Sequence, residues 1–284
     1  MEKPIPPSYH AGMTIHLHID PFSGIAGDMF LGAAIDLGVP VEAIEQALAP
    51  LQVSPAYRIT TRRIQRHGIG AVDLRVELID PHVNSESHQH SHHHHHHHTH
   101  YRDIMNMIDR MDTTERAKDR ARLIVTRLAE AEARVHGVPI EKVHFHEVGA
   151  VDSIVDMLGT AVALEELNVE TLSCGVLPIS RGFVKCDHGL MPVPAPATAY
   201  LLQGLATEGV DRQGELITPT GAAIVKALCC RFGAPPAMTL RAVGYGAGDR
   251  EDPKVPNLLR LMLGDVSTVS KLTPTAEPPE PIES

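Results

Sequence analysis

The sequence predicts an α+β protein in which helices pack against a mixed sheet, with a disordered His-rich loop and a disordered C-terminal tail. Hydrophobic residues make up 43% of the 284 residues, which indicates a folded core. Strand-like and helix-like segments are interspersed along the chain, and we find no internal repeat. We therefore expect one domain over residues 13–265, a disordered lead-in over 1–12, the His-rich loop at 82–100 and the tail at 266–284.

The first part of the chain predicts a strand, two helices and a hairpin. Residues 13–20 alternate apolar or β-branched residues with polar ones, which is typical of a strand. A helix follows, with Ser23 or Asp28 as its N-cap and Gly38 at its C-terminal end, and a second, shorter helix comes next. Strand-like runs on both sides of RHGIG predict a β-hairpin.

The rest of the chain predicts longer helices separated by short strands. Two strong helices follow the His-rich loop, and HFHEVGAVDSIVD becomes helical from about Val151. Residues 171–196 predict two strands joined by the turn SRG. Thr218 or Thr220 caps a later helix, and GYGAGD is expected as a glycine turn between the last two strands.

Composition argues against several classes of protein. The formal charge is −10 with His neutral, so we expect no nucleic-acid partner. The N-terminal segment lacks the apolar stretch of a signal peptide, and no apolar run is long enough to cross a bilayer, so we expect no membrane insertion. The four Cys form no CxxC pair, which favours reduced thiols and a cytoplasmic location. We also expect a homo-oligomer.

Ten histidines lie within residues 87–100. Imidazole is a good ligand for nickel, copper and zinc, so His92, His94 and His96 are candidate metal ligands. A flexible run offers many equivalent positions, whereas catalysis needs a fixed ligand set. We therefore expect metal storage or delivery from this loop, with a solvated insert of no function as the alternative.

The segment HFHEVGAVDSIVD is the first candidate for a defined site. His144 and His146 point to one face of an extended segment, and Glu147 follows directly. Asp152 and Asp156 share a helix face near the N-terminus, where the helix dipole favours carboxylates. The cluster fits metal binding or general-base catalysis. The alternative is an N-cap, a solvated carboxylate and two edge-strand imidazoles, and spacing does not decide between them.

The segment DPFSGIAGDM is a second candidate. Gly24 and Gly27 permit close approach of a ligand to the backbone, and Ser23 adds a hydroxyl beside a helix N-terminus, which together indicate phosphate binding. The spacing matches neither GxGxxG nor GxxxxGK[ST]. Asp20 and Asp28 flank the turn and would suit a metal instead. A tight turn with small residues for packing is the structural alternative.

Two later segments add candidate ligand contacts. Arg181 and Lys185 are possible phosphate partners, and His188 precedes the rigid PVPAP segment. TPTGAA begins a helix with the hydroxyls of Thr218 and Thr220, which also suits an anion.

Six collinear motifs resemble the LarC nickel-insertion family. They are IDPFSGIAGDMFLGAAIDLG, HFHEVGAVDSIVD, SRGFVKCDHGLMPVPAPATAYLL, ELITPTGAAI, GYGAGDR and PNLLRLMLGD. The resemblance spans residues 14–265, and a His-rich loop at this place is also typical. It implies insertion of nickel into pyridinium-3,5-bisthiocarboxylic acid mononucleotide, giving the nickel-pincer nucleotide cofactor of lactate racemase and related enzymes, with consumption of CTP in the presence of Mg or Mn.

The resemblance also implies roles for the candidate residues. The two glycine- and threonine-containing helix starts, with Arg181 or Lys185, would hold the substrate phosphate. His144, His146 and Glu147 would present nickel, supported by Asp152 or Asp156. Forming the nickel–carbon bond removes a ring proton, for which His146 or Glu147 is the candidate base.

One departure from the family concerns length. Typical members continue beyond the equivalent of LLRLMLGD into a second domain that is associated with CTP, so we expect this chain to work with a separate C-terminal CTP-binding partner. Alternatives are a chain that has lost CTP chemistry, a nickel-storing metallochaperone without catalysis, and a metal-dependent hydrolase that uses the His and Glu cluster.

Overall fold

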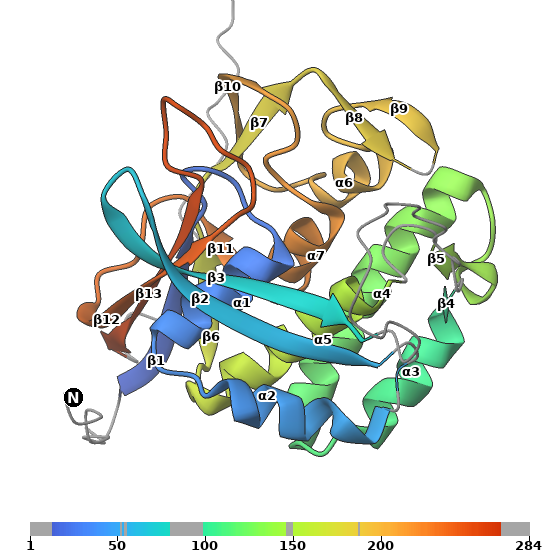
Figure 1. Cartoon of the computed structure of the whole chain (residues 1–284), viewed down its shortest axis with the longest axis horizontal. Helices are drawn as coiled ribbons and strands as arrows, with labels where there is room; N and C mark the ends of the chain where they lie inside the picture. Colours follow the sequence, from blue (N-terminus) through green and yellow to red (C-terminus); the bar gives the residue numbers. More distant parts are fainter. Residues whose placement is uncertain are drawn as a thin grey trace, which may run out of the picture.

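The computed structural model describes residues 13–51, 53, 56–79, 99–145, 150–186 and 188–267 (Figure 1). The α-helices within these ranges are α1 (Gly27–Asp36), α2 (Val41–Leu48), α3 (Tyr101–Arg110), α4 (Glu115–His136), α5 (Val151–Glu166), α6 (Pro196–Leu201) and α7 (Pro219–Leu228). The strands are β1 (Met13–Asp20), β2 (Tyr57–Arg66), β3 (Ile69–Leu78), β4 (Thr99–His100), β5 (His144–Phe145), β6 (Thr171–Cys174), β7 (Leu177–Arg181), β8 (Phe183–Cys186), β9 (Gly189–Pro192), β10 (Thr207–Gln213), β11 (Cys229–Phe232), β12 (Thr239–Ala247) and β13 (Leu258–Ser267). The predicted α+β class is confirmed.

The main sheet is mixed, as expected. Its strand order is β11-β6-β1-β13-β12-β3-β2. β1 runs parallel to β6 and antiparallel to β13, so that His16 lies between Thr171 and Gly264. β2 and β3 form the predicted hairpin, and its turn at His67 and Gly68 takes the positive φ values that two-residue hairpin turns require.

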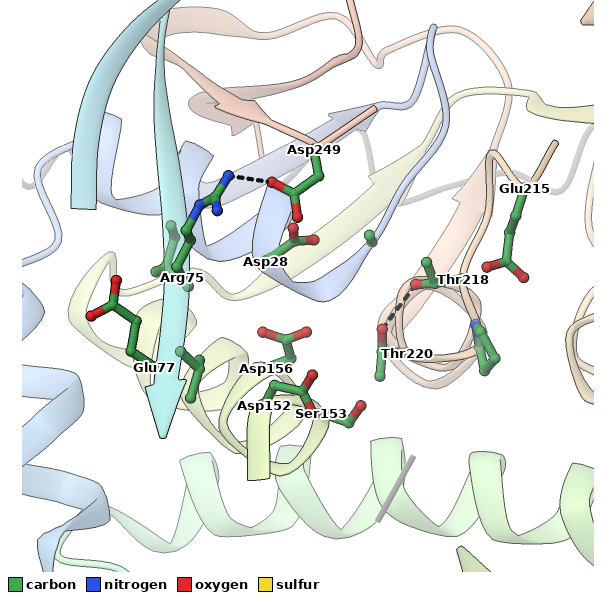
Figure 2. A pocket seen from close by; sticks show the side chains of 14 residues that line it. Asp28, Arg75, Glu77, Asp152, Ser153, Asp156, Glu215, Thr218, Thr220 and Asp249 are labelled. Atoms are coloured by element: carbon green, nitrogen blue, oxygen red, sulfur yellow. Dashed lines mark hydrogen bonds and ion pairs between the residues drawn. The ribbon is translucent and has the colours of Figure 1, made fainter. Parts of the chain in front are cut away.

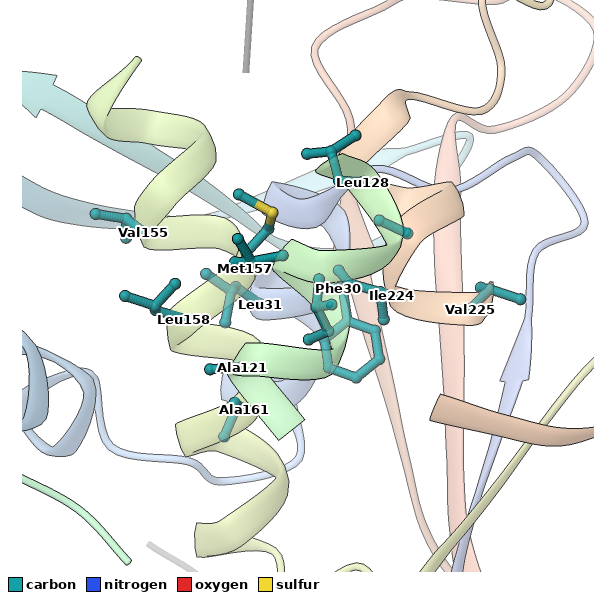
Figure 3. Packing of buried hydrophobic residues seen from close by; sticks show 14 of the residues in the cluster. Phe30, Leu31, Ala121, Leu128, Val155, Met157, Leu158, Ala161, Ile224 and Val225 are labelled. Carbon is teal, nitrogen blue, oxygen red and sulfur yellow. The ribbon is translucent and has the colours of Figure 1, made fainter. Parts of the chain in front are cut away.

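One face of this sheet carries the helices. α1 lies on β12, β3 and β13, while α5 and α7 pack on α1 and α4 packs on both (Figure 1). Phe30, Leu31, Met157 and Ile224 are fully buried among these helices (Figure 3). Because aromatic residues are scarce, the core is built mainly from Ala, Val, Leu and Ile.

Glycines bring α1 unusually close to the sheet. A Cβ atom on Gly246 would lie 1.8 Å from the carbonyl oxygen of Met29, and one on Gly244 would lie 2.3 Å from that of Ala33. GYGAGD therefore begins inside strand β12 and serves helix–sheet packing, so its prediction as a turn is wrong for Gly244 and Gly246.

Other local predictions need correction. The N-cap of α1 is Ala26, not Ser23 or Asp28. The N-cap of α5 is Ala150, not Asp152. Thr218 does cap α7, since its Oγ accepts the N–H of Gly221 at 3.2 Å. Four short strands, β6 to β9, replace the two expected over this segment, because β7 leaves the main sheet to pair with β10.

The ends and the His-rich loop are largely outside the described residues. The structure does not describe the expected lead-in at 1–12, most of the His-rich loop (residues 80–98) or residues 268–284. Thr99 and His100, predicted as the end of the loop, pair with β5 as strand β4. None of the described helices has the length and apolar character needed to cross a bilayer.

Candidate functional site

A pocket of about 530 Å³ opens between β3 and the N-terminal ends of α1, α5 and α7 (Figure 2). It is lined by Ala26, Asp28, Leu74, Arg75, Val76, Glu77, Asp152, Ser153, Asp156, Glu215, Thr218, Pro219, Thr220 and Asp249. Six of these side chains are carboxylic acids and one is a guanidinium, so the pocket is strongly acidic. Such a lining favours cations.

Two of the sequence motifs meet directly beneath this pocket. The N–H of Ile25 donates to the carbonyl of Leu216 at 2.9 Å, and the N–H of Thr218 donates to the carbonyl of Ile25 at 3.1 Å. Gly24 has φ +111° and a Cβ there would lie 1.9 Å from the carbonyl oxygen of Leu216. A glycine is therefore required for the turn before α1 to join the turn before α7.

Three helices direct their N-termini at the pocket. Its lining contains Ala26, the residue before α1, Asp152 in the first turn of α5, and Thr218, the residue before α7. Each N-terminus carries unpaired N–H groups and about half a positive charge. This partial charge stabilises the carboxylates that gather there.

Asp28 and Asp156 form the floor of the pocket. Figure 2 shows the two carboxyl groups facing each other, one from α1 and one from α5. Gly27 makes this approach possible, because a Cβ on it would lie 2.5 Å from the Cβ of Asp156 and 2.6 Å from its Oδ2. The backbone of Asp28 acts on the Asp156 carboxyl and lowers its pKa, which partly offsets the effect of burial.

Both carboxyl groups of the Asp28–Asp156 pair hold protons more firmly than usual. Burial raises the pKa of Asp28 to about 6, and the negative charges of Asp249 and Asp73 act in the same direction. Burial, followed by the charges of Asp28 and Asp152, raises the pKa of Asp156 well above its ordinary value. The pair therefore offers both a proton-accepting group and, once ionised, oxygen ligands for a cation.

The walls of the pocket are hydrogen-bonded. Arg75 pairs with Asp249 at 2.8 Å, which neutralises the one guanidinium in the lining (Figure 2). The hydroxyls of Thr218 and Thr220 lie 2.9 Å apart and share a hydrogen bond. Across the described part of the chain, no group of three or more His, Cys, Asp or Glu is arranged to hold a metal ion.

The structure brings together five of the residues singled out from the sequence. Asp28, Asp152, Asp156, Thr218 and Thr220 line the same pocket although they come from three separate motifs.

Two other predicted site residues shape the pocket and one lies behind it. Gly24 and Gly27 bring its walls together. Ser23 is buried and accepts a hydrogen bond from Arg212 at 3.0 Å.

The remaining described candidates lie outside the pocket lining. Asp20 is paired with Arg260, and Arg181 is paired with Asp211. The ring of His188 lies 5.1 Å from that of His136, and the ring of His144 lies 4.0 Å from that of His100. His146, Glu147, His92, His94 and His96 fall outside the described residues, so their assignment to metal or catalysis stays a prediction.

Sequence reasoning missed the contribution of β3 and of two loops. Arg75 and Glu77 lie two residues apart on β3. Glu215 lies in the loop before α7, and Asp249 lies in the loop after β12. The alternation along β3 could have indicated that Arg75 and Glu77 share a face. Nothing in the sequence indicated that this face meets the start of α5.

The fold and its acidic pocket define a candidate cation-binding protein of the α+β class. Comparison with known families is more specific: residues 17–279 match the family described as nickel insertion protein, and the chain belongs to that family.

Curated relatives agree with this assignment. A putative nickel insertion protein of Citrifermentans bemidjiense is 49% identical, over 89% of this chain and 62% of its own length. A pyridinium-3,5-bisthiocarboxylic acid mononucleotide nickel insertion protein of Geobacillus kaustophilus is 44% identical, over 91% of this chain and 62% of its own length. The chain thus spans about 62% of these relatives. No solved structure matches it.

Proposed function

We propose that this chain inserts nickel into pyridinium-3,5-bisthiocarboxylic acid mononucleotide, yielding the nickel-pincer nucleotide cofactor used by lactate racemase-type enzymes. The named substrate of the Geobacillus relative supports the choice of substrate. The observation that carries the proposal is the pair of half-buried Asp28 and buried Asp156 on the floor of a pocket at three helix N-termini. The pocket is large enough to admit an aromatic ring, since small-molecule sites range from about 300 to 1,000 Å³.

The ligand chemistry of the pocket suits transfer of nickel. Carboxylate oxygens are hard ligands, whereas the thiocarboxylate sulfurs of the substrate are softer and bind nickel more firmly. Nickel held by Asp28 and Asp156 would therefore pass readily to the sulfurs of a substrate bound beside it. Further ligands would come from the substrate sulfurs, or from His146 and Glu147, which the sequence predicts as nickel ligands.

The same pair can also account for the proton that is released. Forming a nickel–carbon bond breaks a ring C–H bond, whose electron pair goes to nickel and whose proton needs an acceptor. A carboxyl with a pKa of about 6 is ionised at neutral pH and accepts a proton more readily than an ordinary Asp. We therefore add Asp28 as a candidate base beside His146 and Glu147.

CTP chemistry is proposed for another polypeptide. The relatives extend well beyond the part that this chain matches. We place the use of CTP with Mg or Mn in that part, supplied by a separate C-terminal partner.

The test is an insertion assay with purified chain, the thiolated pyridinium nucleotide, nickel and CTP, with and without the candidate partner. Formation of the nickel product is followed by mass and absorbance. Asp28→Asn and Asp156→Asn should abolish it, whereas Asp119→Asn, which changes an exposed carboxylate on α4, should not. Product formation unaffected by both pocket variants would refute the proposed site.

A nickel-storing metallochaperone is the alternative, which the ten histidines of residues 87–100 favour. Deleting residues 88–98 separates the two functions. An insertion enzyme keeps its activity when nickel is in excess, whereas a storage protein loses most of its nickel capacity and shows no product with any partner.

A further inference from the structure

Three arginines gather beside the acidic pocket, around the loop that joins β12 to β13. We call Arg66, Arg212 and Arg250 the arginine cluster. They come from the end of β2, from β10 and from the loop itself. None is a pocket-lining residue, and none was singled out in the sequence.

Arg212 is the most buried member, with 10% of its side chain exposed. Its Nε donates to Asp252 at 3.0 Å and its Nη2 donates to the Ser23 hydroxyl at 3.0 Å. Ser23 lies in the turn that leads into α1, so Arg212 ties the arginine cluster to the base of the pocket.

Arg250 leaves part of its guanidinium unused. Its Nη1 donates to the carbonyl of Gln213 at 2.7 Å, and its Nη2 is buried without an acceptor among the described residues. Gly214 makes room for it, because a Cβ there would lie 3.2 Å from Nη1. A buried N–H with no acceptor is costly, so such a group indicates a ligand that supplies one.

Arg66 repeats this feature. Its Nη2 reaches the carbonyl of Gly248 at 3.4 Å and its Nη1 lies 3.9 Å from the exposed Glu251, but its Nε is buried without an acceptor among the described residues. Two of the three guanidinium groups therefore have an N–H that is hidden from water and unpaired.

The charges around Arg212 and Arg250 also favour binding of an anion. Burial and the neighbouring charge of Arg212 lower the pKa of Arg250, and the charge of Asp252 offsets part of this effect. Asp252 is the carboxylate within ion-pair distance of Arg212, and Arg250 has no ion pair among the described residues. An anion between these groups would relieve the repulsion and accept the unpaired N–H groups.

The loop that holds the arginine cluster is well anchored. His67 Nε2 lies 2.9 Å from the carbonyl of Asp252, and Asp252 Oδ1 accepts the N–H of Lys254 at 2.9 Å. Gly214 and Gly248 directly precede Glu215 and Asp249, which line the pocket. The arginine cluster therefore adjoins the acidic pocket through two stretches of backbone.

We propose that the arginine cluster binds the phosphate monoester of the pyridinium mononucleotide, so that the ring enters the acidic pocket while the phosphate stays outside it. This inference rests on the proposed function, which it extends by naming where the phosphate is held. Guanidinium groups suit phosphate because their planar N–H groups match its oxygens.

The test measures recognition of phosphate without nickel or turnover. Nicotinate mononucleotide and its dephosphorylated riboside are titrated into the full chain by calorimetry. The wild-type chain should bind the mononucleotide about 10- to 100-fold more tightly, the range expected for charge-assisted hydrogen bonds. Arg250→Gln should remove most of this difference, and Arg250→Lys, which keeps the charge but not the fork, should remove part of it.

Arg63→Gln is the matched control. Arg63 lies on the same strand as Arg66, but its side chain is 73% exposed and pairs with Asp36. This variant should keep the full preference for the mononucleotide. Thermal unfolding of each variant checks that the fold is retained, and Arg250→Lys carries the test if Arg250→Gln does not fold.

Three results would overturn the proposal. The first is equal affinity of the wild-type chain for the mononucleotide and the riboside. The second is an undiminished preference for the mononucleotide in both Arg250 variants. The third is displacement of bound mononucleotide by CTP at a lower concentration than is needed when the mononucleotide itself is the competitor. If Arg250-dependent binding is seen but no nickel product ever forms, the phosphate site stands and the proposed function fails. If product forms with Arg250 unimportant, the reverse holds.

Discussion

Replacing Asp28 by Asn should stabilise the metal-free protein at neutral pH. Asp28 is half-buried beside Asp156, and its ionised form is disfavoured by this burial and by neighbouring carboxylates. The amide is nearly isosteric, its oxygen can still accept the N–H of Met29, and its N–H₂ group can donate to Asp156. The substitution therefore removes an electrostatic cost without opening a cavity.

The size and sign of the effect follow from the pKa. In the unfolded chain the carboxyl has its usual pKa of 3.8, and in the folded chain the pKa is about 6. Between these values the folded state binds the extra proton, so the free energy of unfolding falls as the pH rises. Above pH 6 the full cost remains, at most ~3 kcal/mol. Well below pH 3.8 both states are protonated and the cost disappears.

Thermal unfolding between pH 4 and pH 8, in the presence of a chelator, measures this directly. At pH 7.5 the Asp28→Asn variant should melt about 6–12 °C above the wild-type chain, using 2–4 °C for each kcal/mol. At pH 4 most of this difference should be gone. Asp152→Asn, which changes an exposed carboxylate in the same pocket, serves as the control. A lower melting temperature for Asp28→Asn at pH 7.5, or the same difference at both pH values, would refute the reasoning.

Three further predictions concern the same site. The first uses a chain that lacks residues 88–98, whose nickel affinity is measured by calorimetry. The affinity should fall as the pH drops through about 6, because protons then compete with nickel for Asp28. An affinity that does not depend on pH would mean that nickel binds elsewhere. Gly27→Ala should destabilise the protein by about 1–3 kcal/mol in chemical unfolding, since its Cβ would overlap Asp156, and should weaken nickel binding in the chain that lacks residues 88–98. Unchanged stability would contradict the close approach of α1 to α5. Thr218→Ala should cost about 1 kcal/mol of stability through loss of the α7 cap, whereas Thr220→Ala, which leaves that cap intact, should cost less.

Local patterns predicted the elements better than their arrangement. The start of α5 at Val151, the β2–β3 hairpin and the Thr218 cap were predictable because each depends on neighbouring residues. The caps of α1 and α5 were not, because neither helix is capped by its own preceding residue. Asp156 lies beside the start of α1 although it belongs to another helix, and this position follows from tertiary packing.

The candidate site shows the same division. Asp28, Asp152 and Thr218 were found because carboxylates and hydroxyls at helix starts are visible in the sequence. Their convergence depends on contacts such as that between Gly24 and Leu216, which are distant in the chain. The arginine cluster was missed for a similar reason. Arg66, Arg212 and Arg250 belong to three segments, and although Arg250 ends the motif GYGAGDR, nothing in the sequence links it to the other two.

Charge balance explains why phosphate and nickel should be held in separate places. The pocket has six carboxylic side chains, and its one guanidinium is paired with Asp249. Three helix N-termini contribute together only about 1.5 positive charges. A phosphate about 5 Å from a single ionised carboxylate would be repelled by ~3 kcal/mol or more at an effective dielectric constant near 20. The phosphate site predicted at the starts of α1 and α7 therefore fits the charges less well than the arginine cluster does. The proposed substrate ring, which is positively charged, and a nickel ion would in contrast both be attracted into the pocket, and the reacting atoms would then lie beside Asp28 and Asp156.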